Sequence, residues 1–593
     1  MQQTHGELSG QEENPSRDHE YSEQYRSKLP QGGTSGLSDS DPSGFLNKDF
    51  TVTEVNLILK GLGNGKAAGH DELVNEALKE APISFTRLLT KMFNLVKATG
   101  KVPKAWNRGR IVLIHKKGPV ADVSNYRPLT ILPCMYSAYS KVLNARLTEV
   151  VEKHHLLGEV QNGFRRDRSG IDSAFILNSV LWKTSAQQKK VNLAFLDLQK
   201  AYDSIQRDTL WKILADKGFG GAFLESLKSL YKGDYVVSDV NGIPTKPCYL
   251  GRGLRQGCSL SPLLFALYVA DMSMELHLSN LGVKMHRVCI SCLFFADDIV
   301  LIARDADGLR ALRDIVQRHC RELGMKISVS KSKVLSSVQD VWELFENDVV
   351  AGTFEKVLMF KYLGVETKLS PAKSARAMMK RATTLASSYS KTCMSLAFDG
   401  PDIVDLAMCL WGNVGLPSIL YGCEIITFSK SAIDEIERQQ SAVGKFNLGL
   451  PLNAPNISAS SILGIKPFRE QLYTAQLKYL LRLFNQDSRR WSKDAFLDHL
   501  NGTWNSKYIK YMTDLRDEVG LKRWPRSIKE IKLSLEAHFL KRTNDEIDRL
   551  DLPALEPLAK RARMEFVNET KESQVDTPCM FLADSHIQVY QLC

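Results

Sequence analysis

The strongest constraint on the fold is a pair of adjacent aspartates between two apolar runs. Residues 292–296 read CLFFA and residues 299–303 read IVLIA, with Asp297 and Asp298 between them. Each run has the length and the β-branched or aromatic content of a buried strand. The segment therefore predicts a hairpin that carries two carboxylates at its tip, where they repel each other and favour bound cations. Taken alone, the segment favours a solvated turn, because Asp is common in turns, and the segments upstream reverse this reading.

A third carboxylate, Asp197, ends another apolar run. Residues 191–198 read VNLAFLDL and predict a strand, after which the sequence becomes polar. An acid at a strand end can face a cleft while the strand itself stays in the core. The alternative is that Asp197 caps the helix predicted from about 207 to 215. For Asp203 we expect a capping or supporting role rather than metal binding.

Basic residues gather near a short strand predicted over residues 111–114. This strand leads into Lys117, and Arg127 follows in the segment NYRPL. Cations delivered to a turn suit an anionic ligand such as a triphosphate. A solvated lysine turn is the simpler alternative.

Three arginines, Arg165, Arg166 and Arg168, fall within four positions beside Phe164. Clustered arginines next to an aromatic side chain suit contact with a nucleic-acid backbone. Asp167 keeps a structural alternative open, because it could pair with a neighbouring arginine.

Residues 251–262 read GRGLRQGCSLSP and form a predicted glycine-spaced loop. Its glycines let a ligand approach the backbone, and a following helix N-terminus favours anions. Ser261 is the predicted N-cap of that helix and Pro262 its first residue.

The whole-chain composition narrows the class of protein. At 593 residues the chain exceeds one core, which predicts two to four domains. The net charge of +11 favours a polyanionic partner, and a merely basic surface explains it equally well. The 11 cysteines form no disulfide framework, which favours a reducing compartment. We find no signal peptide and no apolar run of about 18 residues, so we expect no membrane-spanning segment.

Nine segments resemble, in this order, the reverse transcriptase of non-LTR (LINE-type) retrotransposons. They run from about residue 60 to 365 and are GKAAGHDEL, LIHKKG, NYRPLTIL, QNGFRRDRSGIDS, AFLDLQKAYDSI, GLRQGCSLSPLLF, FFADDIVL, GMKISVSKSK and FKYLG. Each segment is a weak signal by itself. Together, in family order and at plausible spacings, they are highly specific.

The resemblance implies an α+β right-hand polymerase with fingers, an antiparallel palm sheet and a helical thumb. Beyond about residue 370 the sequence pattern is itself helical. We therefore expect five segments: a disordered tail (1–48), a helical extension of the fingers (49–110), the fingers and palm (111–368), a helical thumb and C-terminal extension (369–540), and a weakly structured tail (541–593).

The activity that the resemblance implies is RNA-directed DNA polymerisation. A primer 3′-OH attacks the α-phosphorus of a deoxynucleoside triphosphate, and two Mg²⁺ ions about 3.5–4 Å apart assist. Asp197, Asp297 and Asp298 would hold these ions, with Asp297 the closer ligand of the pair. Lys331 matches a lysine that protonates the leaving pyrophosphate.

The resemblance also implies a nucleotide site. Tyr202, five residues after the first acid, falls on the aromatic gate that would collide with a ribose 2′-OH. Arg127 and Lys117 would hold triphosphate oxygens. Gln256 and Gly257 would line the nucleotide site.

The sequence departs from the family pattern in one loop and one turn. Ala68 and His70 stand where prolines are usual, Glu72 where glycine is usual, and Ser328 where asparagine is usual. These departures affect loop rigidity and no metal ligand. The endonuclease of full retrotransposon proteins is missing, so we expect a polymerase that is a fragment of a longer element protein.

The expected partners are an RNA template, a DNA primer and dNTPs, at an intracellular location in the nucleus and cytoplasm that the family implies. The sequence does not indicate an oligomeric state. One alternative is a catalytically silent nucleic-acid-binding remnant of an element, and another is a protein similar to group II intron maturases.

Overall fold

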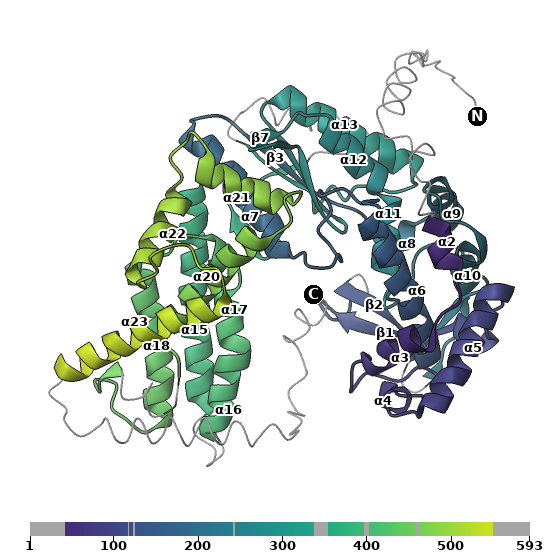
Figure 1. Ribbon diagram of the computed structural model, residues 1–593, viewed down its shortest axis with the longest axis horizontal. Coiled ribbons are helices and arrows are strands. Elements are labelled where there is room, and N and C mark those ends of the chain that lie inside the picture. Colours follow the sequence, from purple (N-terminus) through teal and green to yellow (C-terminus); the bar gives the residue numbers. More distant parts are fainter. Residues whose placement is uncertain are drawn as a thin grey trace, which may run out of the picture. The chain divides into compact units, whose positions relative to one another are not determined.

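The computed structural model describes residues 42–549 apart from 117, 123–124, 241–242, 337–353, 397–402, 457–462 and 464. The chain divides into two compact units that are each discontinuous in sequence. Unit 1 comprises Met1–Gly158, Gln199–Glu275 and Arg318–Lys326, and unit 2 comprises Glu159–Leu198, Leu276–Gln317 and Ile327–Cys593. Helices and mixed sheets occur together, so the predicted α+β class is confirmed (Figure 1).

Unit 1 combines a five-stranded sheet with helices. Its strands are β1 (Arg108–His115), β2 (Tyr126–Ile131), β4 (Tyr235–Val240), β5 (Ile243–Pro244) and β6 (Cys248–Tyr249). They have the order β2-β1-β4-β5, and β6 also pairs with β4. The helices are α2 (Pro42–Asn47), α3 (Val52–Lys60), α4 (Asn75–Lys79), α5 (Ile83–Thr99), η1 (Lys104–Asn107), α6 (Cys134–Lys153), α8 (Ala201–Ser204), α9 (Arg207–Asp216), α10 (Gly221–Tyr231) and α11 (Ser261–Tyr268).

The start of α3 follows directly from its sequence. Thr51 is the N-cap, and Glu54 completes a capping box with it. The Thr51 hydroxyl accepts from the Glu54 N–H at 3.2 Å, and the Glu54 carboxylate accepts from the Thr51 N–H at 2.7 Å. This exchange satisfies two N–H groups that the first helical turn leaves unpaired.

Unit 2 is built on a second five-stranded sheet, with the order β12-β11-β3-β10-β9. Its strands are β3 (Asn192–Asp197), β9 (Cys292–Phe295), β10 (Asp298–Ala303), β11 (Lys333–Leu335) and β12 (Glu355–Lys356). Two further hairpins pair β7 (Val283–Met285) with β8 (Val288–Ile290) and β13 (Phe360–Tyr362) with β14 (Val365–Thr367). The strands predicted around Asp197 and on both sides of Asp297 and Asp298 are thus confirmed.

The helices of unit 2 follow mainly after the sheet. They are α7 (Gly170–Ala186), α15 (Pro371–Leu396), α16 (Ile403–Leu410), η3 (Trp411–Gly415), α17 (Leu416–Leu420), η4 (Cys423–Ile425), α18 (Lys430–Asn447), α20 (Phe468–Asn485), α21 (Trp491–Asn501), α22 (Lys507–Glu518) and α23 (Ile528–Arg549). By sequence, α12 (Ala270–Leu278) and α13 (Ala306–Glu322) belong to both units. Figure 1 shows α15 and α18 side by side, and the two helices pack along each other.

One helical stretch, Asp405–Ile425, is long and apolar enough to cross a membrane by length and composition, with a mean hydropathy of 1.3. It includes α16, which packs against both α15 and α18. The stretch therefore packs in part against the unit 2 helices, and 39% of its most apolar window is buried.

Helical structure extends into both segments that were predicted as tails. Helix α2 begins at Pro42, and its Leu46 is fully buried, so packed structure starts before residue 49. Helix α23 continues to Arg549, past the predicted boundary at 541, and buries Ile531, Leu535 and Phe539 at helical spacing. Residues 1–41 and 550–593 lie outside the described residues.

Candidate active site

Three carboxylates gather at one end of the unit 2 sheet. Strand β10 lies between β9 and β3, and the register pairs Asp298 with Phe295 on one side and with Asp197 on the other. Directly opposed residues on antiparallel strands have Cβ atoms about 4.5–5.5 Å apart. Asp297 lies in the two-residue turn next to Asp298, so two acids from the hairpin and one from β3 meet at its tip.

Apolar packing beneath the acids fixes this arrangement. Along β10, residues 300–303 are fully buried, and β3 is buried up to Leu196. Because both strands are buried along this length, side-chain packing holds the register that places Asp197 opposite Asp298.

The carboxylates influence one another electrostatically. Part of the Asp298 side chain is exposed, but its carboxyl group lies among protein atoms and two other acids. Burial, reinforced by the charges of Asp297 and Asp197, raises the pKa of Asp298 to about 7, and nearby Lys331 opposes this rise. The cluster thus carries more negative charge than its surroundings neutralise.

Lys331 lies beside Asp197 because the segment 328–332 wraps around that residue. The Ser328 N–H donates to the Asp197 carbonyl at 2.7 Å, and the Asp197 N–H donates to the Ser332 hydroxyl at 3.2 Å. These contacts bring the Lys331 ammonium group to 3.3 Å from the Asp197 carboxylate. Ser328 thus makes a backbone contact that asparagine would also allow, and the importance of Ser332 was missed from the sequence.

Gln161 supports the turn that carries Asp297, and its importance was also missed from the sequence. Its side-chain carbonyl accepts from the N–H of Ala296 at 3.0 Å and of Gly163 at 2.9 Å, and only 1% of its surface is exposed. Ala296 adopts a left-handed φ of 56°, which is unfavourable for a residue with a Cβ. Gly163 packs so closely that a Cβ would lie 2.4 Å from the Ala296 nitrogen.

The donor set suits a hard divalent cation. Carboxylate oxygens are the ligands that Mg²⁺ prefers, and a cation would offset both the burial and the repulsion that raise the pKa of Asp298. Within the part of the chain that the structure describes, no three His, Cys, Asp or Glu side chains already form a ready metal site. The Lys331 ammonium group supplies the nearest positive charge to Asp197.

The predicted nucleotide residues lie in unit 1, and three of them share one neighbourhood. The Gln256 side chain donates to Asp203 at 3.1 Å, one residue after Tyr202. A Cβ at Gly257 would lie 2.5 Å from the Thr130 carbonyl, and the Thr130 N–H donates to the Gln256 carbonyl at 2.7 Å. Asp203 thus contacts the glycine-spaced loop, which fits the supporting role expected of it.

Arg127 and the Tyr202 ring have further neighbours of their own. Arg127 lies on β2 opposite Ile114, with an exposed side chain. Lys117 lies outside the described residues. The Tyr202 ring stacks on Phe265 with centroids 5.1 Å apart.

One predicted cap is wrong, and one alternative role as a cap is excluded. The N-cap of α11 is Leu260, and Ser261 is the first helical residue, because its hydroxyl donates to the Arg255 carbonyl at 2.8 Å. The N-cap of α9 is Gln206, so Asp197 does not cap that helix.

The predicted nucleic-acid contact by three arginines is wrong for Arg168 and Arg165. Arg168 forms a bidentate ion pair with Glu159 at 2.6 and 2.7 Å, and only 4% of its side chain is exposed. Arg165 is buried and donates to the Gln161 carbonyl at 3.1 Å. Arg166 is exposed. The structural alternative therefore holds, with Glu159 rather than Asp167 as the partner.

Comparison with known proteins agrees with this geometry. A reverse transcriptase (RNA-dependent DNA polymerase) family model matches residues 114–367. The chain is 28% identical over 298 residues to the transposon TX1 uncharacterized 149 kDa protein of Xenopus laevis, covering 49% of this chain and 22% of that protein. It is 27% identical over 290 residues to the RNA-directed DNA polymerase from mobile element jockey of Drosophila melanogaster, covering 47% and 31%.

A longer match extends into the helical part of the chain. The Pol polyprotein from the type-1 retrotransposable element R2 of Popillia japonica is 25% identical over 413 residues, covering 68% of this chain and 55% of that protein. The chain spans 22%, 32% and 31% of the length of the first three curated relatives. Among solved structures, apo telomerase from Candida tropicalis matches with a TM-score of 0.34 and 10% identity, covering 70% of this chain and 72% of that one.

Proposed function

Residues 114–367 form a reverse transcriptase domain of the non-LTR retrotransposon type, and we propose on this premise that the chain is an RNA-directed DNA polymerase. It would add deoxynucleotides to a DNA primer 3′-OH on an RNA template. The observation that carries the proposal is the register that sets Asp197 opposite Asp298, with Asp297 in the adjoining turn.

Reverse transcriptases use divalent metal ions, and we propose two Mg²⁺ ions held by Asp197, Asp297 and Asp298. When bound, these ions would activate the primer hydroxyl and neutralise charge on the leaving pyrophosphate. The pKa of about 7 at Asp298 supports this assignment, because three crowded carboxylates need a cation to ionise fully near neutral pH.

The remaining proposed roles belong to side chains alone. Lys331 carries a proton beside the acids and would donate it to the leaving pyrophosphate. Tyr202 would exclude a ribose 2′-OH with its ring. Arg127 would hold triphosphate oxygens together with Lys117, and Gln256 and Gly257 would line the nucleotide site.

The test is primer extension on poly(rA)/oligo(dT) by the wild-type protein and by Asp197→Asn and Asp297→Asn in parallel. Each variant should lose extension to the level of a reaction without enzyme, because each removes a metal ligand without changing side-chain size. Asp216→Asn, which neutralises an exposed acid at the end of α9, should behave as wild type. Undiminished extension by Asp297→Asn would refute the metal assignment.

The same experiment separates the alternative function. A wild-type protein that binds RNA in a salt-sensitive manner but incorporates no dNTP would be a silent remnant of an element. Incorporation that depends on the three acids excludes that reading.

A further inference from the structure

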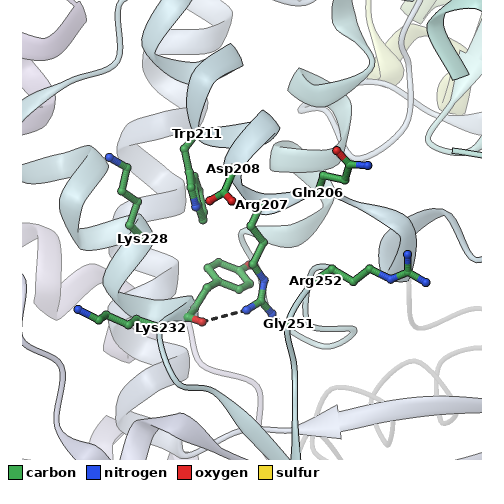
Figure 2. A pocket seen from close by; sticks show the side chains of 9 residues that line it. Gln206, Arg207, Asp208, Trp211, Lys228, Lys232, Gly251 and Arg252 are labelled. Carbon is green, nitrogen blue, oxygen red and sulfur yellow. Dashed lines mark hydrogen bonds between the residues drawn. The ribbon is translucent and has the colours of Figure 1, made fainter. Parts of the chain in front are cut away.

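Unit 1 contains a cavity of about 700 Å³ between α9, α10 and the start of the glycine-spaced loop (Figure 2). None of the residues assigned above to the triphosphate or the acids lines it. The lining residues are Gln206, Arg207, Asp208, Trp211, Lys228, Tyr231, Lys232, Gly251 and Arg252.

The floor of the cavity is rigid. Arg207 donates to the carboxylate of Asp234 at 2.8 and 3.0 Å, and to the carbonyls of Tyr231, Leu250 and Gly253 at 2.8–2.9 Å. One guanidinium thereby ties α9, α10 and the loop together through all three of its nitrogen atoms. These contacts hold the floor of the cavity in one shape before a ligand binds.

The rim carries an excess of positive charge. Figure 2 shows Lys228 and Lys232 on one side of the cavity and Arg252 on the opposite side. Lys232 and Arg252 are exposed and form no ion pair with any residue that the structure describes, whereas Lys228 pairs with Glu225 at 2.7 Å. Asp208 is the one acid among the lining residues. Two cations at opposite edges of the cavity suit a ligand that carries more than one negative charge.

An aromatic surface lies between these cations. Trp211 is half-buried and its ring centroid is 5.8 Å from that of Tyr231, so the indole is held in place. Indole rings stack with nucleobases of any identity, and cationic grooves track the backbone of single strands. Asp208 and Gln206 add polar groups that could face a base edge.

We propose that this cavity binds one nucleotide of a single-stranded RNA, with its base against Trp211 and its flanking phosphates at Lys232 and Arg252. The proposal rests on the proposed function, which supplies RNA as the strand. Arg252 precedes Gln256 by four residues in the same loop, so RNA bound here would contact the loop that carries the proposed nucleotide site.

The test measures binding of a fluorescein-labelled short oligouridylate to the full chain across a salt series. Lys232→Gln/Arg252→Gln should lower the steepness of log K against log salt by about 1.4, since each phosphate contact on a single strand contributes roughly 0.7. The matched control is Lys212→Gln/Lys246→Gln, which removes two exposed cations of unit 1 outside the cavity. Trp211→Leu should weaken binding about five-fold or more, and Trp211→Phe should restore most of it.

Photocrosslinking locates the bound strand independently. A thiouridine-substituted oligouridylate should crosslink to the peptide that contains Trp211 in the wild type, and less in the double variant. Binding equal to that of the control, together with crosslinks elsewhere, would overturn the proposal. Displacement of the strand by free uridine monophosphate at similar concentration would also overturn it, because the cavity would then be a mononucleotide site.

Primer extension with the same preparations keeps the two proposals apart. If the wild-type protein cannot extend a primer but its RNA binding is lost in the cavity variants, the proposed polymerase function is refuted and the proposed RNA site in the cavity is supported. If the wild-type protein extends primers and the cavity variants bind and crosslink RNA as the wild type does, only the proposed RNA site in the cavity is refuted.

Discussion

Gln161 supports the turn that carries Asp297, one of the proposed metal ligands. A two-residue hairpin turn with positive φ at its first position favours glycine, and Ala296 occupies that position here. The Gln161 side chain compensates by accepting from the Ala296 N–H, which leaves the turn in one conformation. The acid side chains are therefore not needed to hold the turn and are available to bind a ligand.

We expect Gln161→Ala to lower kcat about 10- to 100-fold with little change in the KM for dNTP, because supporting groups of metal ligands have effects of this size. Gly163→Ala should act in the same direction, since its Cβ would meet the turn at 2.4 Å. Steady-state primer extension measures both. Gln187→Ala, at the end of α7, is the control. An unchanged kcat in both variants would show that the turn holds its shape unaided.

Tyr202 offers a test of substrate choice. Its ring stacks on Phe265, so its position is fixed and it can exclude a substituent by size. Tyr202→Val should lower the preference for dNTP over rNTP by roughly ten-fold or more, whereas Tyr202→Phe should keep it, because the ring and not the hydroxyl collides. The ratio of kcat/KM for dTTP and UTP is the measurement. An equal ratio in Tyr202→Val would assign the gate elsewhere.

At the scale of elements, a buried charge cluster joins β4, α9 and the loop before α11. Asp234 is only 1% exposed and pairs with both Arg207 and Arg255, the latter at 3.1 Å. Arg255 also lies over the Tyr136 ring at 4.9 Å. The loop that carries Gln256 is thus anchored by the neighbouring residue Arg255, through its ion pair with Asp234.

Asp234→Asn should destabilise unit 1 by about 3–5 kcal/mol, because it leaves two buried arginines without a counter-charge. The midpoint of urea unfolding measures this loss, and Asp216→Asn, an exposed acid, is the control. If the cluster positions the loop, the KM for dNTP should also rise under conditions where the variant remains folded. A midpoint within error of the control would show that the arginines find other partners.

Elements were predictable where one short-range signal dominated. The apolar runs around Asp197, Asp297 and Asp298 predicted strands correctly, because burial on both faces leaves a continuous hydrophobic pattern. The prediction of Ser261 as a cap failed because its hydroxyl has several possible hydrogen-bond partners, and it donates to the Arg255 carbonyl. The pairing of Arg168 with Glu159 crosses nine residues and leaves no periodic trace in the sequence.

At the scale of the whole molecule, the sequence predicted several domains and a helical region after the sheet. It did not predict which segments of the chain belong to which unit. Each unit takes three separated stretches of sequence. Contacts between distant segments decide this division, and local propensity does not contain them. The same holds for stability: the helical region of unit 2 depends on a buried side chain whose charge state the sequence leaves open.

That side chain is His499, which packs against Phe175, Trp504 and Tyr508 with ring centroids 4.9–5.9 Å apart. Its Nδ1 lies 2.6 Å from the Ser506 hydroxyl. Burial lowers the pKa of His499 to about 3; the charge of Asp498 opposes this effect and that of Lys183 adds to it. The imidazole is therefore neutral in the folded protein and becomes protonated on unfolding whenever the pH is below about 6.5.

Stability should consequently fall as the pH decreases from about 6.5 toward 3, because the unfolded state binds one more proton than the folded state in this window. The slope from this group is about 1.4 kcal/mol per pH unit, or roughly 2 kcal/mol between pH 6.5 and 5. Urea unfolding of the wild type and of His499→Gln at these two pH values measures the difference, with His154→Gln as the control for a half-buried histidine at a helix end. The His499→Gln protein should lose about 2 kcal/mol less than the control on acidification. Equal losses would mean that His499 is solvated or paired when charged, and that the unit 2 helices tolerate its proton.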